Sequence, residues 1–423
     1  MANPSELARS LWWATTSAGA TLEEAEGDMA TDVLVIGAGL SGLFAALHLV
    51  EQGRTALVLE AREPGYGASG RNAAGCVPMW LGMLPTQVEA KLGAPGARLN
   101  ALHAQAPSLL HGIVERHAIE CDLRSRGATI FAHRMGAAPW LERLCAEWNT
   151  RGGRVTFDAD ATPPSLLFRT PAGPSATFHA AATVNPLALG RGLADAVQRL
   201  GGRIFARSPA IGLVRQAGGW TAVTRKARVT ARHVVVATEG YEAIEGLTPL
   251  LARSYMRVPF GILVSAPVQD IEDILPDRRP IADTNRANPL WLMADAQDRL
   301  LLSMLPPAGR SAGLEKPGRL AARRLRRMFR ALPVEWAHYW EADIAIGGNG
   351  LPRLMEMDEN LVALGGYSGQ GILPALIAGK ELARRLDGQS DIALPVEAPR
   401  PMRGRSLVPW LLRYAVFPLA RSF

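Results

Sequence analysis

The feature that most constrains this fold is a glycine-rich turn between an apolar run and a helical pattern. Val33–Ile36 is an apolar, largely β-branched run, and the six residues that follow read GAGLSG. Leu43–Leu49 then has apolar residues at helical spacing, and a second apolar run covers Ala56–Leu59. This order predicts strand, turn, helix and strand, and a right-handed crossover makes the two strands parallel. Because both strands are apolar throughout, we expect a sheet that is covered on both faces.

This first glycine turn, residues 37–42, has the spacing of a dinucleotide-binding fingerprint. Gly37 permits the tight turn, Gly39 lets a pyrophosphate approach the backbone, and Gly42 lets helix and strand pack closely. The helix N-terminus supplies free N–H groups and the positive end of the helix dipole. Glu60 follows the second strand, where its carboxylate can accept hydrogen bonds from ribose hydroxyls and repels a 2′-phosphate. The fingerprint alone does not separate NAD from FAD.

Residues 65–76 form a small-residue loop, GYGASGRNAAGC. Such a backbone can lie against a flat ring and offer N–H groups without obstruction from side chains. Arg71 in its middle either pairs with a phosphate or braces the loop. A flexible surface linker is the alternative, but the loop lacks the Lys, Glu, Gln and Pro residues typical of one.

Composition and charge exclude several classes of protein. The 423 residues are 48% hydrophobic and 20% charged, with a net charge of +7, which is globular and long enough for about two domains. The charge fits an anionic cofactor, acidic lipid or simply a solvated basic surface. Arg319–Arg330 is rich in arginine, but apolar residues recur within it at helical spacing. We therefore expect an amphipathic helix with a solvated basic face, and no nucleic-acid binding.

Cysteine usage and the termini suggest a reducing compartment. Cys76, Cys121 and Cys145 contain no CxxC pair, which argues against a disulfide framework or a metal site. No signal-peptide pattern and no long apolar run is present, so we expect a cytoplasmic protein. The tail, residues 391–423, places apolar and aromatic residues between basic ones. It suits either an anionic membrane surface or a helix docked on its own domain, and both alternatives stay open.

The remaining patterns are interleaved along the chain. VNPLALGRGLADAVQRLGGRIFA predicts a helix and a strand, HVVVA a buried strand, and ENLVALGGYSGQGILPALIAGKELARRL a strand, glycine turn and helix. Short alternating runs over 250–310 indicate an antiparallel sheet. We expect an α/β fold: a Rossmann-like cofactor-binding domain built from discontinuous segments, and an antiparallel-sheet α+β substrate domain. The predicted boundaries are 1–85, 183–250 and 335–390 for the first domain, 86–182 and 251–334 for the second, and 391–423 for the tail.

Four segments together resemble a known family. DVLVIGAGLSGLFAALHLVEQG, LEAREPGYGASGRNAAG, HVVVATEGY and GGYSGQGILPALIAGKELA resemble, in order, the FAD-dependent oxidoreductases of the D-amino-acid oxidase family. The nearest branch is that of the glycine/sarcosine oxidases and gamma-glutamylputrescine oxidase-like enzymes, although its two glycines after SGRN are alanines here. The resemblance implies FAD, and oxidation of a C–N bond of an amine or amino-acid-like substrate by hydride transfer to flavin N5, giving an imine that hydrolyses.

The resemblance also implies where FAD lies. The first glycine turn would hold the pyrophosphate, Glu60 the adenosine ribose, and residues 67–72 the isoalloxazine ring and ribityl chain. The late glycine turn, residues 366–371, would place a helix N-terminus near the pyrimidine end of the flavin, where reduced flavin carries negative charge. The predicted cofactor-binding residues are Gly37, Ala38, Gly39, Leu40, Ser41, Gly42, Glu60, Ala61, Arg62, Gly67, Ala68, Ser69, Gly70, Arg71, Asn72, Ala210, Ala237, Thr238, Gly366, Tyr367, Ser368, Gly369, Gln370, Gly371 and Ile372.

The chain departs from the family in its substrate sheet. The branch carries an aromatic–aromatic–arginine run that can hold a substrate carboxylate, and the matching residues here end in Met293 after Trp291. Losing a bidentate arginine removes about 1.5–3 kcal/mol, so we expect a bulkier or more apolar amine rather than a free D-amino acid or glycine. Trp291 and Met293 are the predicted substrate-pocket residues, with sheet core as the alternative. Arg257 or Arg286 is a candidate substitute for the missing arginine.

No catalytic residue is predicted, because an amine that arrives neutral needs no base. Family members that bind flavin covalently use a cysteine near the late glycine turn, and WEADIAIGGNGLPRL has none. We expect non-covalent FAD, with Cys76 as the exception to test. The electron acceptor is oxygen or a quinone. The alternatives are a flavin monooxygenase of an aromatic substrate, disfavoured by GGYSGQG where GDAAH is typical, and a non-catalytic flavin-binding subunit.

Overall fold

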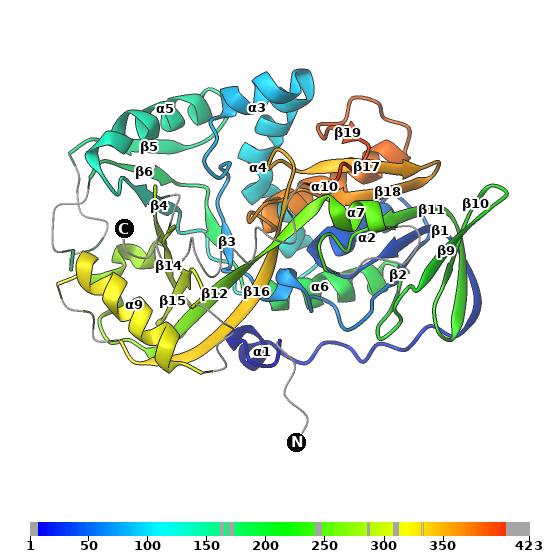
Figure 1. Ribbon diagram of the computed structural model, residues 1–423, viewed down its shortest axis with the longest axis horizontal. Coiled ribbons are helices and arrows are strands. Elements are labelled where there is room, and N and C mark those ends of the chain that lie inside the picture. The colour runs from blue at the N-terminus through cyan, green and yellow to red at the C-terminus, as the bar shows by residue number, and fades with distance from the viewer. Residues whose placement is uncertain are drawn as a thin grey trace.

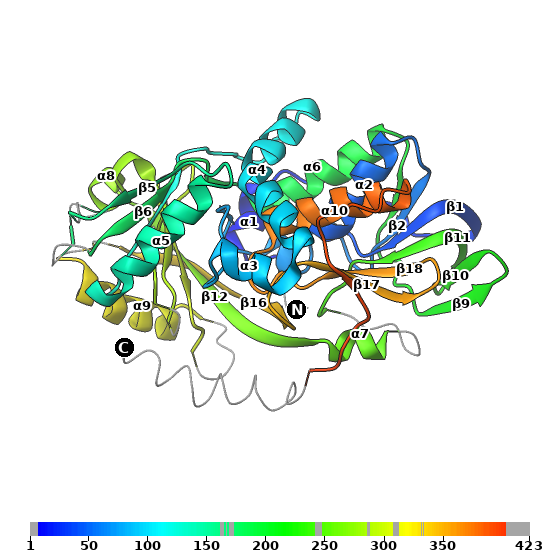
Figure 2. The ribbon, with the colours of Figure 1, turned by 90° about the horizontal axis from the view of Figure 1, so that it is seen from above.

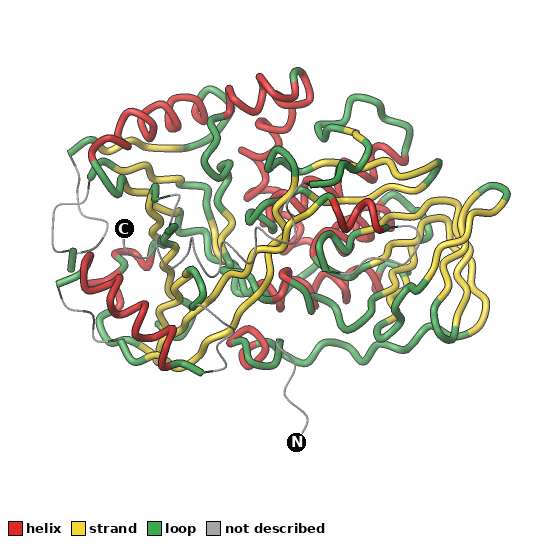
Figure 3. The backbone as a smooth tube through the Cα atoms, in the orientation of Figure 1, coloured by secondary structure: helices red, strands yellow, loops and turns green. Residues whose placement is uncertain are grey.

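A computed structural model describes residues 7–160, 165, 167–168, 173–241, 248–285, 288–307, 313–330, 332 and 334–402. Two sheets lie side by side along the long axis of the molecule (Figure 1). Two long strands, β12 and β16, run diagonally between them (Figure 3). The arrangement is the α/β architecture that the sequence predicts.

The first sheet has nine strands and is built around the predicted βαβ unit. β1 pairs in parallel with β2, in the register Val33↔Ala56, and with β11 on its other side. The central strands are buried on both faces, as their apolar runs predict. The strands are β1 (Gly27–Ile36), β2 (Ala56–Leu59), β8 (Arg203–Phe205), β9 (Gly212–Gln216), β10 (Gly219–Val223), β11 (Ala227–Val236), β17 (Arg353–Asp358), β18 (Leu361–Gly365) and β19 (Val396–Glu397).

Helices cover one face of this sheet (Figure 2). α2 and α10 cross closely: a Cβ added at Gly379 of α10 would lie 2.6 Å from the backbone of Phe44 and Ala45. α6 begins where the Asn185 side chain accepts hydrogen bonds from the first turn, with Pro186 at the first helical position. The helices on this side are α2 (Leu40–Glu51), α4 (Ala94–Arg116), α6 (Pro186–Arg199) and α10 (Ile372–Leu386), and α3 (Pro85–Leu92) packs on α4.

The second sheet has eight strands, and most of its pairs are antiparallel, as predicted for 250–310. α9 (Glu315–Met328) packs on it through Ala321 and Leu325. Arg319 is exposed, whereas Arg324 turns inward to pair with Asp283 at 3.3 Å. The strands are β4 (Ala128–Phe131), β5 (Val155–Asp158), β6 (Ser175–Phe178), β12 (Tyr255–Pro267), β13 (Ile281–Asp283), β14 (Trp291–Ala294), β15 (Arg299–Met304) and β16 (Trp336–Gly347).

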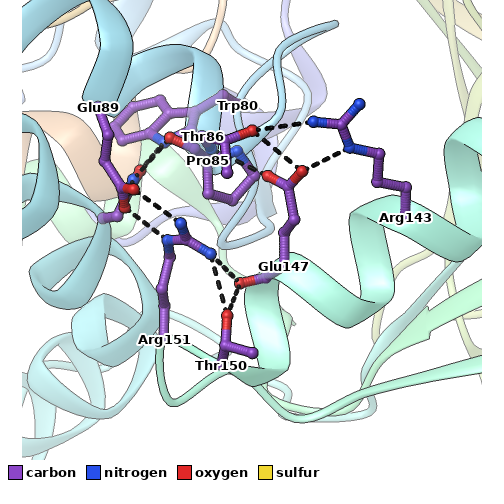
Figure 4. A network of polar contacts seen from close by, with 9 residues as sticks. Trp80, Pro85, Thr86, Glu89, Arg143, Glu147, Thr150 and Arg151 are labelled. Carbon is purple, nitrogen blue, oxygen red and sulfur yellow. Dashed lines mark hydrogen bonds and ion pairs between the residues drawn. The ribbon is translucent and has the colours of Figure 1, made fainter.

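A polar network ties α3 to α5 (Ala138–Asn149) beside this sheet (Figure 4). The guanidinium of Arg151 donates to both carboxylate oxygens of Glu89, at 2.6 and 2.7 Å. Glu147 accepts hydrogen bonds from the backbone and the hydroxyl of Thr86. The short elements are α1 (Leu11–Thr15), α7 (Pro249–Arg253), α8 (Ile271–Ile274), β3 (Gly75–Cys76) and β7 (Ala182–Thr183).

The sheets divide the chain differently from the predicted boundaries at two places. β16 lies in the predicted cofactor-binding segment 335–390 but belongs to the second sheet, and β19 lies in the predicted tail but joins the first. Neither strand was predicted from the sequence, and a local pattern does not identify the strand with which a segment pairs. The division into two domains stays a prediction. None of the described helices has the length and apolar character that spanning a bilayer requires.

Candidate functional site

The first glycine turn has the close contacts that its glycines imply. Gly37 has a φ of +106°, and a Cβ there would lie 3.0 Å from the Ala237 carbonyl oxygen. A Cβ at Gly42 would overlap the carbonyl oxygen of Gly37. Gly39 precedes α2 and supplies no side-chain cap. The positive end of the α2 dipole therefore faces the turn with only small residues around it.

The acidic residue after β2 reaches back to this turn. Glu60 accepts hydrogen bonds from the backbone N–H groups of Ala38, at 2.7 Å, and Arg62, at 2.8 Å. The N–H of Ser208 donates to the Glu60 carbonyl oxygen, which brings the segment before Ala210 alongside. The structure thus gathers the residues predicted for the adenosine end of the cofactor at one edge of the first sheet.

The end of β11 lies next to the same turn. The Ala237 N–H donates to the Ile36 carbonyl oxygen at 2.8 Å. The methyl group of Thr238 would lie 3.4 Å from a Cβ at Gly37, and its Oγ1 is buried without a hydrogen-bond partner among the described residues. A buried hydroxyl without a hydrogen-bond partner costs free energy of folding. This position therefore suits a bound ligand that hydrogen-bonds to the hydroxyl.

The late glycine turn is held from two sides. The Gln370 side chain accepts a hydrogen bond from the Leu81 N–H at 2.7 Å and donates to the Met79 carbonyl oxygen. On the other side, the Glu239 carboxylate accepts from the N–H groups of Gly366, at 3.1 Å, and Tyr367, at 3.3 Å. α10 then starts at Ile372 with its first N–H groups facing this turn.

Glu239 has an unusual protonation equilibrium. Burial raises the pKa of its carboxyl to about 7, although the Tyr367 and Gly366 N–H groups and the nearby Arg353 act in the opposite direction. It is the third residue after β11, in ATEGY, with a left-handed φ of 49°. Sequence reasoning missed this residue, and its signal was a carboxylate shortly after a buried strand.

Arg71 braces the small-residue loop. Its side chain is buried, its Nε donates to the Gly67 carbonyl oxygen at 3.2 Å, and its guanidinium lies over the rings of Tyr66 and Tyr241. These contacts favour the bracing role over pairing with a phosphate. Ser69 of the same loop accepts a hydrogen bond from the Leu40 N–H at 2.9 Å, which brings the loop over the first glycine turn.

Trp291 and Met293 lie beside the small-residue loop but in different surroundings. The Trp291 ring would be 2.8 Å from a Cβ at Gly75, so only glycine fits at position 75. Trp291 itself is half-buried. Met293 is buried in an apolar cluster with Ile262. Its packing favours the sheet-core alternative, whereas Trp291 keeps its place as a predicted substrate-pocket residue. Arg257 is exposed on β12, and Arg286 lies outside the described residues.

An apolar face of the second sheet approaches the late glycine turn. Side chains alternate along β12 and β16, and the registers Val258↔Ile344 and Phe260↔Ala342 place these residues on one side. Ile344 Cδ1 lies 3.5 Å from a Cβ built at Gly369. The apolar face consists of Met256, Val258, Phe260, Ile262, Trp340, Ala342, Ile344 and Ile346. No member of this set is charged.

Cys76, the last residue of the small-residue loop, is fully buried. Burial raises the pKa of its thiol far above the ordinary value, and the neighbouring Cys121 acts in the same direction. A thiol held in its protonated form is a poor nucleophile. This environment disfavours a covalent bond from Cys76 to a cofactor.

Comparison with known proteins identifies the family. The family model for FAD-dependent oxidoreductases (DAO) matches residues 32–385. The chain belongs to this family. It is 29% identical over 371 residues to gamma-glutamylputrescine oxidoreductase of Escherichia coli (strain K12), covering 85% of this chain and 84% of that protein.

Solved structures share the fold of this FAD-dependent oxidoreductase. Glycine oxidase from Geobacillus kaustophilus superposes with a TM-score of 0.71 at 19% identity, over 86% of this chain and 96% of that one. L-proline dehydrogenase from P. horikoshii gives a TM-score of 0.72 at 14% identity, over 86% and 96%. The predicted family, fold class and FAD dependence are therefore confirmed.

The residues present fit FAD. The glycines leave room for a pyrophosphate at the N-terminus of α2, and the Glu60 carboxylate lies beside the same turn. The buried Thr238 hydroxyl has no hydrogen-bond partner among the described residues. The assignment of individual residues to parts of the cofactor stays a prediction. In the part of the chain that the structure describes, no cluster of three metal-ligating side chains occurs.

Proposed function

We propose that this FAD-dependent oxidoreductase oxidises a C–N bond of an amine and that it binds this amine mainly through an apolar group of the substrate. The observation that carries the proposal is the apolar face beside the late glycine turn. The sequence also has no arginine at position 293 that could hold a substrate carboxylate. The likeness to gamma-glutamylputrescine oxidoreductase supports an amine as substrate. The chemistry that FAD would supply when bound is acceptance of a hydride from the carbon that bears the amine.

The chain's own residues bind, orient and exclude water. Phe260 and Ile344 offer surface to an alkyl or aromatic group, and burying such a group gains about 25 cal/mol per Å². The half-buried Trp291 would limit the pocket at the small-residue loop. No described residue is assigned as a base, so the amine must arrive neutral or lose its proton to water.

The electron acceptor is oxygen or a quinone, and we propose no preference between them. Membrane contact through the tail concerns residues 391–423, of which 403–423 lie outside the described residues. A cytoplasmic location stays a proposal.

An anaerobic experiment tests the proposed function. Purified holoprotein is mixed with D-amino acids, N-methyl amino acids, polyamines and arylalkyl amines while the flavin absorption is followed. We expect bleaching by amines without a carboxylate next to the reacting carbon, and slower or no bleaching by glycine. Readmitting air then separates an oxidase from a dehydrogenase.

Three outcomes would contradict the proposal. Fast bleaching by glycine would overturn the apolar substrate class. NADPH consumption that depends on an aromatic substrate would indicate a monooxygenase. Bound FAD that no amine reduces would indicate a non-catalytic flavin-binding subunit.

A further inference from the structure

Three tryptophans from distant parts of the chain hold three consecutive carbonyl groups of the small-residue loop. The indole N–H groups of Trp340, Trp12 and Trp291 donate to the carbonyl oxygens of Arg71, Asn72 and Ala73, at 3.0, 2.9 and 2.9 Å. The donors come from β16, α1 and β14 respectively. The loop is thus fixed by a short α-helix near the start of the chain and two strands of the second sheet.

These indoles are packed so that few other partners are within reach. Trp12 and Trp340 are each only 3% exposed, and their rings meet edge to face with centroids 6.1 Å apart. Trp291 is fixed by its ring against Gly75. A buried indole N–H requires an acceptor, and each here takes a backbone carbonyl of the loop. α1 itself is held by Ser10, whose hydroxyl accepts a hydrogen bond from the Trp13 N–H.

The direction of these carbonyl groups fixes the direction of the N–H groups. In a trans peptide the N–H points opposite to the carbonyl of the preceding residue. The N–H groups of Asn72, Ala73 and Ala74 therefore each point away from the indole that binds the carbonyl of the same peptide group. That of Ala74 donates to the Asn72 side chain at 2.8 Å. Those of Asn72 and Ala73 have no acceptor among the hydrogen bonds of the described residues.

We propose that Trp12, Trp291 and Trp340 are positioning residues for the cofactor: they hold the loop carbonyl groups so that the N–H groups of Asn72 and Ala73 face the flavin. The proposal rests on the predicted placement of the flavin along residues 67–72 and not on any substrate. It makes α1 part of the cofactor site, although α1 precedes the first glycine turn by more than twenty residues.

The test compares Trp12→Phe with Trp13→Phe. The first change removes the donor and keeps an aromatic ring, and the second alters a neighbour that is 37% exposed and packs on Arg191. Apoprotein is titrated with FAD, and the visible absorption, circular dichroism and midpoint potential of the bound flavin are recorded. We expect Trp12→Phe to weaken FAD binding about tenfold, because a loop carbonyl loses its donor. Trp13→Phe should stay within about twofold of the wild type.

The spectroscopic readouts separate positioning from simple support of the fold. N–H donors aimed at flavin stabilise its electron-rich reduced form, so Trp12→Phe should move the midpoint potential to a more negative value and shift the visible spectrum. If Trp12→Phe holoprotein has the wild-type potential and spectrum, the proposal is wrong, even if its melting temperature falls.

A second variant covers the case in which Trp12→Phe does not fold. Trp291→Phe keeps a ring against Gly75 and removes only the donor to Ala73. It should shift the potential in the same direction, and an unchanged potential would overturn the proposal. Because both readouts are made without substrate, their failure leaves the proposed amine oxidation untouched.

Discussion

At the scale of single residues, Glu239 is a carboxyl group beside the late glycine turn whose protonation should affect stability near neutral pH. The pKa of its carboxyl is about 7 in the fold, against an ordinary value of 4.5. Between these values the folded protein binds a proton that the unfolded chain has lost, so stability is full below about pH 4.5 and falls as pH rises to about 7. We expect this loss to be about 3 kcal/mol, at about 1.4 kcal/mol per pH unit.

Glu239→Gln should remove that dependence. The amide oxygen can still accept from the Gly366 and Tyr367 N–H groups, while no charge is buried above pH 7. Urea unfolding of the apoprotein at several values between about pH 5 and 8 measures the effect. If the free energy of unfolding of Glu239→Gln depends on pH over this range as strongly as that of the wild type, the Glu239 carboxyl does not titrate in this range.

Glu51 provides the matched control because its shift has the opposite sign. Hydrogen bonds from His48, and also from His117 and Arg116, lower the pKa of its carboxyl to about 2, against an opposing effect of burial. The contribution of Glu51 to the free energy of unfolding is present above about pH 4.5 and is lost as pH falls toward about 2. Glu51→Gln should therefore flatten the acid side of the profile, below about pH 4.5.

At the scale of elements, the crossing of α2 and α10 depends on one glycine. A Cβ at Gly379 would lie 2.6 Å from backbone atoms of Phe44 and Ala45, whereas a Cβ at Gly112 in α4 meets nothing within 4 Å. Gly379→Ala should lower the free energy of unfolding by about 1–3 kcal/mol because the helices must separate. Gly112→Ala, also inside a helix, should raise it by roughly 0.5–1 kcal/mol. Equal effects of the two changes in urea unfolding would contradict this account.

Local patterns made the first part of the fold predictable from sequence. The strand, turn and helix around Gly37 follow from contacts within about thirty residues, and the structure has β1, α2 and β2 in that order. The three indole donors have no such pattern, because Trp12, Trp291 and Trp340 meet only when two sheets and the N-terminal helix assemble. Arg71 is an intermediate case: its position was visible, but its role depended on Tyr66 and Tyr241.

At the scale of the whole molecule, the cofactor site joins segments that the chain keeps far apart. Tyr255 at the start of β12 packs in the core of the first sheet, and Leu263 further along the same strand packs in the core of the second. One strand of the second sheet therefore contributes side chains to the cores of both sheets. We expect them to unfold in one transition, because separating them would expose both cores.

Ligand stabilisation then reports on both ends of the cofactor site. A ligand that binds only the folded protein stabilises it by about 2.7 kcal/mol at a free concentration one hundred times its dissociation constant. FAD should raise the melting temperature of the apoprotein strongly. FMN lacks the adenosine whose ribose Glu60 is predicted to bind, and a carboxylate at that position would repel the 2′-phosphate of NADPH. FMN and NADPH should therefore raise the melting temperature far less than FAD at equal concentration.

Glu60→Gln should reduce the rise in melting temperature that FAD causes and leave the rise that FMN causes unchanged. If FMN matches FAD in wild-type protein, the adenosine end of the predicted site does not contribute to binding, and the placement of FAD along the first sheet is wrong.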